Sequence, residues 1–276
     1  MVVSSVHTLP INDGLSGPQM VELYTRQLEA LGAKKTGTFS VECESYHSNP
    51  AITTANETRV LSLITASEYP ASAFSIIEKS TGSSGSAASS SSNPSASNNN
   101  SSTTSTTSSS SSSSLANSCT VVTDSSFEQI LTNLALFYSK KVHVRMEVRG
   151  QRWTLADFVI KLGTCTMGGN QTFKAIVAEI EYGPCCVPGQ CWDLIKELGQ
   201  TFVGASIHQP QTHLMARMNE LFYPVDAIHQ YSEIFTQLRK GGNVGGGGGG
   251  ILGSKLGDLG GGNSNGSINN NISNGN

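Results

Sequence analysis

Runs of alternating apolar and polar residues constrain this chain more than any other feature of its sequence. Phe39, Val41 and Cys43 alternate with polar side chains, and two later runs, 157–167 and 172–182, are joined by Gly168-Gly169-Asn170. This period of two is that of a strand with one buried face, and glycine turns between such runs favour antiparallel pairing. The same reasoning predicts further strands at 2–6, 60–65, 72–78, 119–122 and 142–148.

Helices are predicted where the apolar period changes from two to that of a helix. Ser16-Gly17-Pro18-Gln19 and Ser125-Ser126-Phe127-Glu128 have the form of capping boxes, and Gly32 suits the end of the first helix. Their apolar stripes are Met20, Leu23, Tyr24, Leu28 and Leu31 in the first helix, and Phe127, Ile130, Leu131, Leu134 and Phe137 in the second. A third helix carries Trp192, Ile195, Leu198 and Phe202, and a fourth, starting at Pro224, carries Ile228, Tyr231, Phe235 and Leu238. For this last helix, core packing is favoured over a partner-binding face.

Low-complexity stretches set the expected domain boundaries. Residues 80–117 are almost entirely Ser, Thr and Asn, and residues 241–276 are mainly Gly, Asn and Ser. Such segments bury too little apolar surface to offset their ordering entropy, so both are predicted to be disordered. Residues 1–79 and 118–240 are expected to form a single domain together, because neither half has enough strands to close a sheet. The halves share an order of elements, for which a duplicated half-barrel is one explanation, but no residue-level repeat.

Charge and hydropathy narrow the classes of function. The formal net charge is −3 and the isoelectric point is about 6.1, which disfavours nucleic-acid binding as the main role. No apolar run approaches the ~20 residues of a membrane span. The first residues, MVVSSVHTLP, lack the features of a signal peptide. We therefore expect a cytosolic or nuclear protein with reduced cysteines.

The stretch EIEYGPCCVPGQCW, residues 179–192, places three cysteines beside two carboxylates. A zinc site usually needs two closely spaced ligand pairs, and only Cys186 and Cys191 have suitable spacing. Cys43, Cys119 and Cys165 are isolated in predicted strands, Cys185 adjoins Cys186, and His208 and His213 lie in a separate loop. We therefore interpret the stretch as the end of a strand and the start of a helix. We predict that the cysteines bind no metal and form no disulfide.

Two E-x-E pairs offer a competing enzymatic hypothesis. Each pair shares one face of a predicted strand, and two such pairs facing each other could hold a divalent cation while nearby cations hold phosphate oxygens. The carboxylates are Glu42, Glu44, Glu179 and Glu181, and the cations are Arg145, Arg149 and Lys174. This is the arrangement of metal-dependent tunnel-type triphosphate hydrolases. The simpler interpretation is that these carboxylates occupy solvated faces of strands.

Several segments of the chain, in order, resemble one known family. They are VELYTRQLEALGAKKTGTFSVECESYH, SEYPASAF, EVRGQRWTLADFVIKLGTCTMG, VAEIEYGPC and CWDLIKELGQTF. Together they closely resemble subunit 20 of the Mediator complex of RNA polymerase II transcription, from Val2 to about Lys240. The Ser-rich insert and the Gly/Asn-rich tail depart from the compact family pattern.

The resemblance implies a fold, a role and a set of partners. The fold is α+β, an open antiparallel β-barrel flanked by α-helices. The role is that of a non-enzymatic, nuclear subunit of the Mediator head module, a transcription coactivator that links gene-specific regulators to RNA polymerase II. The partners are Mediator subunit 18 as heterodimer partner, a helix of Mediator subunit 8 and other head-module subunits. Sequence-specific nucleic-acid binding and membrane contact are not expected. The resemblance transfers no catalytic, cofactor-binding or metal-binding residue.

Overall fold

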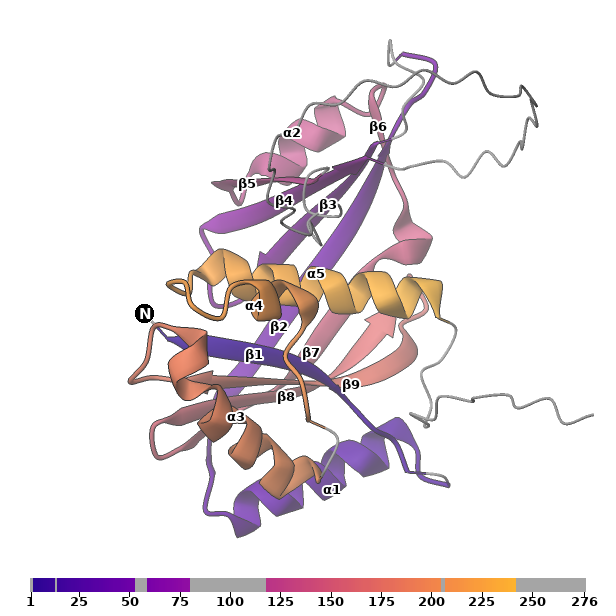
Figure 1. Ribbon diagram of the computed structural model, residues 1–276. Helices are drawn as coiled ribbons and strands as arrows, with labels where there is room; N and C mark the ends of the chain where they lie inside the picture. The colour runs from indigo at the N-terminus through magenta and orange to yellow at the C-terminus, as the bar shows by residue number, and fades with distance from the viewer. Residues whose placement is uncertain (1, 13, 53–58, 80–117, 205–206, 242–276) are drawn as a thin grey trace, which may run out of the picture. The chain divides into compact units, whose positions relative to one another are not determined.

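The computed structural model describes residues 2–12, 14–52, 59–79, 118–204 and 207–241 (Figure 1). The strands are β1 (Val3–Leu9), β2 (Lys34–Ser48), β3 (Arg59–Ala66), β4 (Ser72–Lys79), β5 (Ser118–Asp124), β6 (Tyr138–Lys140), β7 (Met146–Leu155), β8 (Phe158–Met167) and β9 (Thr172–Tyr182). The helices are α1 (Gly17–Ala30), α2 (Phe127–Asn133), α3 (Pro188–Val203), α4 (Thr212–Ala216) and α5 (Pro224–Lys240), with a 3₁₀ turn η2 (Val142–Val144). The predicted disorder of residues 80–117 and of the tail beyond Gly241 lies outside the described residues.

All strand pairs are antiparallel, and they form one sheet in the order β1-β9-β8-β7-β2-β3-β4-β5, with β6 pairing with β2. The sheet is curled. It is also open, because its two outermost strands, β1 and β5, form its edges. Helices cover both faces. The predicted α+β class, an open antiparallel barrel flanked by helices, is therefore confirmed.

The topology relates the two halves of the sheet by an approximate twofold symmetry. Apart from the short β6 and the turn η2, each half runs strand, helix and three strands: β1-α1-β2-β3-β4, then β5-α2-β7-β8-β9. The halves meet where β2 pairs with β7. The first strand of each half crosses to the other half, since β1 pairs with β9 and β5 pairs with β4. The order of elements seen in the sequence is thus a real feature of the fold. Each half supplies the edge strand for the part of the sheet that the other half forms.

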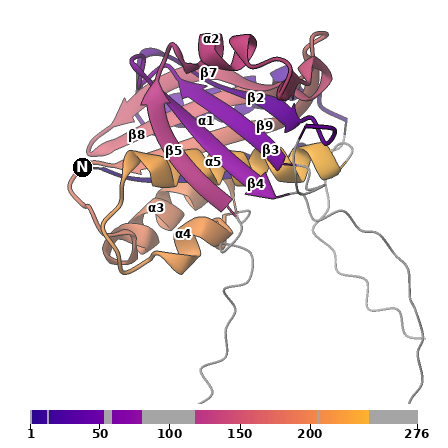
Figure 2. The same cartoon turned by 90° about the horizontal axis from the view of Figure 1, so that it is seen from above.

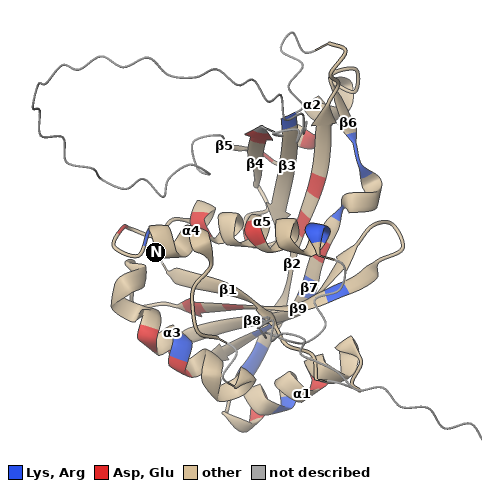
Figure 3. Cartoon of the chain, turned by 45° about the vertical axis from the view of Figure 1, so that its right-hand side comes forward, with Lys and Arg blue, Asp and Glu red and all other residues tan. Residues whose placement is uncertain are grey.

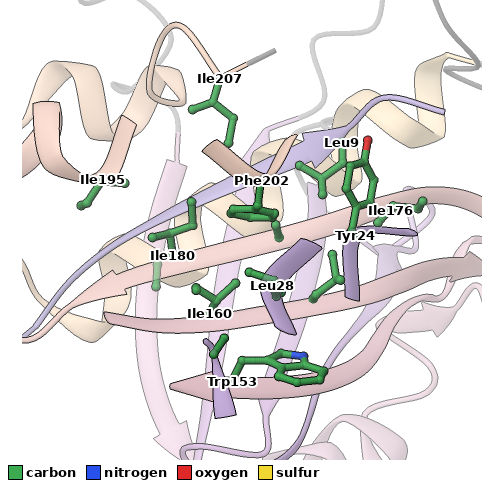
Figure 4. Packing of buried hydrophobic residues seen from close by; sticks show 14 of the residues in the cluster. Leu9, Tyr24, Leu28, Trp153, Ile160, Ile176, Ile180, Ile195, Phe202 and Ile207 are labelled. Carbon is green, nitrogen blue, oxygen red and sulfur yellow. The ribbon is translucent and has the colours of Figure 1, made fainter. Parts of the chain in front are cut away.

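Helix α5 covers one face of the sheet, and the other helices that contact the sheet lie mainly on the opposite face. Tyr231 and Phe235 of α5 pack with Val41, Val148 and Val177 of the central strands. On the other face, α1 and α3 cover the end formed by β1, β9 and β8 (Figure 4). The smaller α2 covers the end formed by β3 and β4 through Leu131. Figure 2 shows α2 and α5 on opposite sides of these strands.

The side chain of Gln230 connects α5 to the free edge of β1. Its amide nitrogen donates to the carbonyl oxygen of Ser4 at 3.1 Å, and its amide oxygen accepts from the backbone N–H of Val6 at 3.0 Å. Gln230 is completely buried. An unpaired strand edge exposes backbone groups that otherwise seek another strand. One side chain therefore replaces part of the missing strand at this edge.

The predicted strand over 142–148 is wrong in its first half. Lys140 of β6 pairs with Tyr46, and Met146 of β7 pairs with Cys43. From Lys140 to Met146 the chain advances six residues, whereas its partner β2 advances only three, from Tyr46 back to Cys43. The surplus residues form the 3₁₀ turn η2 (Val142–Val144), and regular pairing resumes at Met146. Both β6 and α4 were absent from the prediction.

The second capping box is also wrong. Ser126 is the N-cap of α2, but its side chain makes no capping hydrogen bond, and its backbone N–H is bound by the Asp124 carboxylate at 2.8 Å. The helix is short and ends at Asn133. Of its predicted apolar stripe only Leu131 is fully buried, and Ile130, Leu134 and Phe137 are exposed.

The other predicted helices form as expected. A capping box with Gln19 starts α1, and Gly32 has a φ of +86° just beyond its end. Within the α1 stripe, Met20, Tyr24 and Leu28 are buried, whereas Leu23 and Leu31 are exposed. Prolines begin both α3 and α5, and the four predicted apolar residues of α5 are all buried, which confirms core packing.

Candidate functional site

The carboxylates of β9 surround a buried lysine. Lys161, on the neighbouring strand β8, places its Nζ 3.0 Å from Glu179 Oε2, 2.6 Å from Glu181 Oε1 and 2.5 Å from Glu68 Oε2. The Tyr231 hydroxyl of α5 donates to Glu179 Oε2 at 2.9 Å. Lys161, Glu179 and Glu181 are each more than 90% buried. The ammonium group therefore lies at the position between the carboxylates that a cation would need. We call Lys161, Glu68, Glu179, Glu181 and Tyr231 the Lys161 cluster.

Burial and neighbouring charges set the protonation of this cluster. Burial alone lowers the pKa of Lys161, but Glu179, Glu181 and Glu68 outweigh it and hold the pKa above its ordinary value. Burial and the charge of Glu179 raise the pKa of Glu181 to about 7, against the opposing charge of Lys161. Burial and Glu179 also raise the pKa of Tyr231 well above its usual range. The cluster is thus a fixed ammonium ion with a carboxyl group that titrates near neutral pH.

The carboxylates of β2 belong to a different cluster, which is partly open to solvent. Glu42 binds Arg145 at 2.6 Å and lies 3.5 Å from Arg149. The hydrogen bond from Arg145 to Glu42 raises the pKa of Arg145. Glu44 binds Lys140 of β6 at 2.7 Å and accepts a hydrogen bond from the Tyr46 hydroxyl at 2.9 Å. Figure 3 shows acidic positions on β2 next to basic positions on β6 and β7. Each carboxylate is already paired with a cation.

The two E-x-E pairs lie on opposite faces of the sheet, contrary to the enzymatic hypothesis. Glu42 is paired across the ladder with Glu147 of β7, so the next residue, Val148, points to the other face. Val148 packs with Val177 in the core beneath α5, and Glu179 and Glu181 share the face of Val177. The sheet itself therefore separates the two pairs, and a cation cannot contact both.

Two further observations disfavour a triphosphate site. Lys174 lies at the irregularity of β9 where the register with β8 shifts, five residues from Glu179, roughly 16 Å along an extended strand. The cavity beside Lys161 and Glu179 has a volume of about 20 Å³, room for about one water molecule. Small-molecule sites are usually clefts of roughly 300 Å³ or more.

The cysteine-rich stretch is a strand-to-helix transition, as predicted. β9 ends at Tyr182 and α3 begins at Pro188. Cys191 is buried with its thiol 3.6 Å from the Pro188 carbonyl oxygen, and burial raises its pKa to about 12. All six cysteines are free thiols. Over the described ranges, no three or more His, Cys, Asp or Glu side chains are grouped as metal ligands. That no metal binds and no disulfide forms stays a prediction.

Of the two histidines considered as zinc ligands, His213 has another partner. His213 Nε2 lies 2.8 Å from Asp226 Oδ1, and its ring stacks on His229 with centroids 4.4 Å apart. Arg217 also binds Asp226, at 2.5 Å. Hydrogen bonds from His213 and Tyr223 and the charge of Arg217 lower the pKa of Asp226 despite its burial. This group joins α4 to α5.

Exposed apolar side chains are concentrated in the segment of the chain that forms β5, α2, β6 and η2. Of sixteen large apolar side chains exposed in the described part of the chain, seven lie between residues 121 and 142. They are Val121, Val122, Ile130, Leu134, Leu136, Phe137 and Val142. By contrast, Trp153, Phe158 and Tyr182 pack into the core under α1 and α3. Grouped exposed apolar residues mark interaction surfaces more often than isolated ones.

Sequence patterns alone missed the residues at the centre of the buried cluster. Lys161 is a lone charge between Ile160 and Leu162 in an otherwise apolar run, and its position opposite Glu179 depends on strand register. A single lysine in such a run was the available signal, since a buried lysine is rarely found without a partner. Glu68 lies in a turn far away in the sequence, so nothing local indicated its contact with Lys161.

Comparison with known proteins places these features in a family. Residues 1–236 match the protein-family model described as the TATA-binding related factor of subunit 20 of the Mediator complex. Mediator of RNA polymerase II transcription subunit 20 from Anopheles gambiae is 32% identical over 82% of this chain and 89% of that protein. The Xenopus laevis protein of the same name is 32% identical over 87% and 96%, and the human one is 31% identical over 87% and 95%.

Solved structures give weaker similarities. The Schizosaccharomyces pombe Mediator head module contains a chain that is 7% identical with a TM-score of 0.30, covering 87% of this chain and 94% of that one. A conserved hypothetical protein from Pyrococcus furiosus is 10% identical with a TM-score of 0.36, covering 77% and 99%.

The protein is thus an open antiparallel barrel flanked by helices. Its two groups of carboxylates are each paired with lysine or arginine side chains of the same chain. Among proteins with this fold, the family match and the relatives identify one family. The chain belongs to the family of Mediator subunit 20, and the predicted resemblance is confirmed. None of the described helices is both long and apolar enough to cross a bilayer.

Proposed function

We propose that this protein is a non-enzymatic subunit of the Mediator head module and acts in the nucleus as a transcription coactivator. In this role it links gene-specific regulators to RNA polymerase II through protein contacts. Family membership over residues 1–236 is the observation that carries the proposal. The net charge of −3 agrees with a role that does not include direct sequence-specific nucleic-acid binding.

The proposed partners are Mediator subunit 18 as heterodimer partner, a helix of Mediator subunit 8 and other head-module subunits. A subunit that acts through contacts needs apolar surface for a lasting interface. The exposed apolar residues from 121 to 142 supply such surface along β5, α2, β6 and η2. The test is affinity purification of the tagged, full-length protein from nuclear extract. Head-module subunits in equal amounts would support the role, and their absence would contradict it.

The lack of enzymatic activity is the second part of the proposal. It is supported by the opposite faces of the two E-x-E pairs and by Lys161 between the carboxylates of β9. Incubation with nucleoside triphosphates and Mg²⁺ or Mn²⁺ should give no turnover above a blank. Turnover that disappears in the double variant Glu179→Gln, Glu181→Gln would instead establish a triphosphate hydrolase.

We further propose that residues 1–79 and 118–240 fold as one domain interrupted by the insert 80–117 and followed by the tail 241–276. The support is the exchange of first strands between the halves, β1 to β9 and β5 to β4. Neither half can then complete its own part of the sheet. No residue of the chain is proposed as catalytic, cofactor-binding or metal-binding.

A further inference from the structure

The approximate twofold symmetry matches the elements at one end of the sheet to those at the other. At the first end, β1, β9 and α1 lie together, and at the second end their counterparts are β5, β4 and α2. The first end has one more element, because α3 follows β9 directly and packs against β1, β9 and α1. Among the described residues, no helix lies at the matching place over β5 and β4 beside α2.

Helix α3 shows what a helix in this position does. Its stripe Cys191, Ile195 and Phe202 is buried against the sheet. Trp192 meets His7 of β1 with ring centroids 6.0 Å apart. At Gly199 an added Cβ would lie 2.6 Å from Ile207, so the absence of a side chain there permits close packing. The helix covers the edge strand and the flank of α1 at once.

The matching place at the other end has an uncovered apolar surface. The rotation of α2 is seen from Leu131, which is buried against the sheet, and from Glu128, which forms an ion pair with Lys140 of β6 at 2.8 Å. Ile130 is about 200° further around the helix, so it points away from β6 and toward β5. Its side chain is 49% exposed, and that of Leu134, on the same flank, is 38% exposed.

Strand β5 contributes the floor of this surface. Val121 is paired with Ser75, so it shares a face with Ala73, which belongs to the core under α2. Val121 is 43% exposed, and Cys119, two residues earlier on the same face, is also exposed. We call Cys119, Val121, Ile130 and Leu134 the α2–β5 surface.

The amino-acid composition of the chain's own insert does not favour it as the source of the missing helix. Residues 80–117 follow β4 as α3 follows β9, but their one large apolar residue is Leu115. The rest is Ser, Thr, Asn, Gly, Ala and Pro, which cannot form a stripe at helical spacing. After Gly241 the most frequent residue is glycine, whose intrinsic helix propensity is low. These compositions favour an occupant from another chain.

We propose that the α2–β5 surface binds an amphipathic helix from another protein subunit, placed as α3 is placed at the other end. The inference rests on the proposed function, since another subunit of the assembly donates the helix. Its apolar residues should recur at the spacing that α3 uses, three or four residues apart. Exposed Arg59, at the start of β3 on the same face as Leu61, favours an acidic residue at one end of that helix.

A photo-crosslinking side chain at position 121 of the full-length protein, assembled with its partner subunits, tests the proposal. We expect a crosslink to one segment of another subunit that has apolar residues at helical spacing. A photo-crosslinker at position 23, an exposed site on α1, is the matched control and should not reach that segment. A crosslink from position 121 to a loop, to a strand or to residues 242–276 of the same chain would overturn the proposal.

The reactivity of Cys119 gives a second measurement on the same surface. Maleimide should modify Cys119 in the isolated protein and about tenfold more slowly in the assembly, because the helix covers the thiol. Ile130→Glu should restore the fast reaction. Normal assembly with unchanged Cys119 reactivity overturns the helix proposal alone. Failure of the wild-type chain to co-purify with any other subunit overturns both this proposal and the proposed function.

Discussion

At the scale of single residues, Lys161 decides how the buried carboxylates behave. Its ammonium group contacts Glu68, Glu179 and Glu181 in a largely buried setting. Uncompensated charges in such a setting are costly, whereas paired and hydrogen-bonded charges are tolerated. The cluster also holds Tyr231 of α5, so it fixes where that helix lies on the sheet. Acidic residues that suggested catalysis are thus part of the packing.

Replacing this lysine should destabilise the protein strongly. Lys161→Met leaves three carboxyl groups without their shared cation, and we expect a loss of about 3–5 kcal/mol in the free energy of unfolding near pH 7.5. Urea unfolding measures it. The control Lys35→Met removes an exposed lysine and should change stability by about 0.5 kcal/mol or less. Equal effects of the two substitutions would show that the cluster has no such role.

The titration of Glu181 should appear in the dependence of stability on pH. Its folded pKa of about 7 exceeds the ordinary value of 4.5, so the folded state binds more protons between these pH values. This group therefore lowers the free energy of unfolding as pH rises from about 4.5 to about 7. Glu181→Gln removes that loss, and the stability of the variant relative to wild type should increase by about 1–3 kcal/mol from pH 4.5 to pH 7.5. Parallel pH profiles for the two proteins would contradict the assignment.

At the scale of elements, what could be predicted followed from local patterns. The alternating run 172–182 became β9 with the same bounds, and Pro224 began a helix because proline suits a first turn. The turn η2 could not be predicted, because it arises where β6 and β7 both pair with β2. The contact of Lys161 with two β9 carboxylates likewise depends on register, which an alternating pattern leaves open.

Helix α5 should depend on Gln230 for its contact with β1. Gln230→Leu removes two hydrogen bonds to the free edge of β1. The Val6 N–H loses its acceptor, and the Ser4 carbonyl oxygen loses its donor. We expect a loss of about 2–3 kcal/mol in the free energy of unfolding and faster hydrogen exchange at the Val6 amide. Gln237→Leu, at an exposed position of the same helix, is the control and should leave both unchanged. An unaltered Val6 exchange rate in Gln230→Leu would refute the role of this side chain.

At the scale of the whole molecule, we expect the exchange of strands to make the halves depend on each other. β1 completes the sheet of the second half and β5 that of the first. A chain interrupted by a long insert can still form such a sheet, because loop-closure entropy grows only logarithmically with length. The insert is thus expected to separate the halves in sequence without separating them in folding.

Deleting residues 82–114 should therefore leave the thermal midpoint nearly unchanged. Fragments 1–79 and 118–240 made separately should not fold, and they should recover the native circular dichroism spectrum when co-expressed. Thermal melts of the deletion variant and spectra of the fragments measure these expectations. A large fall in the midpoint on deletion, or a folded fragment on its own, would contradict the single-domain proposal.

The most direct test of the account is co-expression of the full-length protein with Mediator subunit 18, followed by size-exclusion chromatography. A subunit with exposed apolar surface at the β5 end should be poorly soluble alone and gain yield with its partner, because a partner that binds the folded state stabilises it. The account predicts one peak containing both chains in a 1:1 ratio. A soluble monomer that elutes separately from Mediator subunit 18 would contradict it.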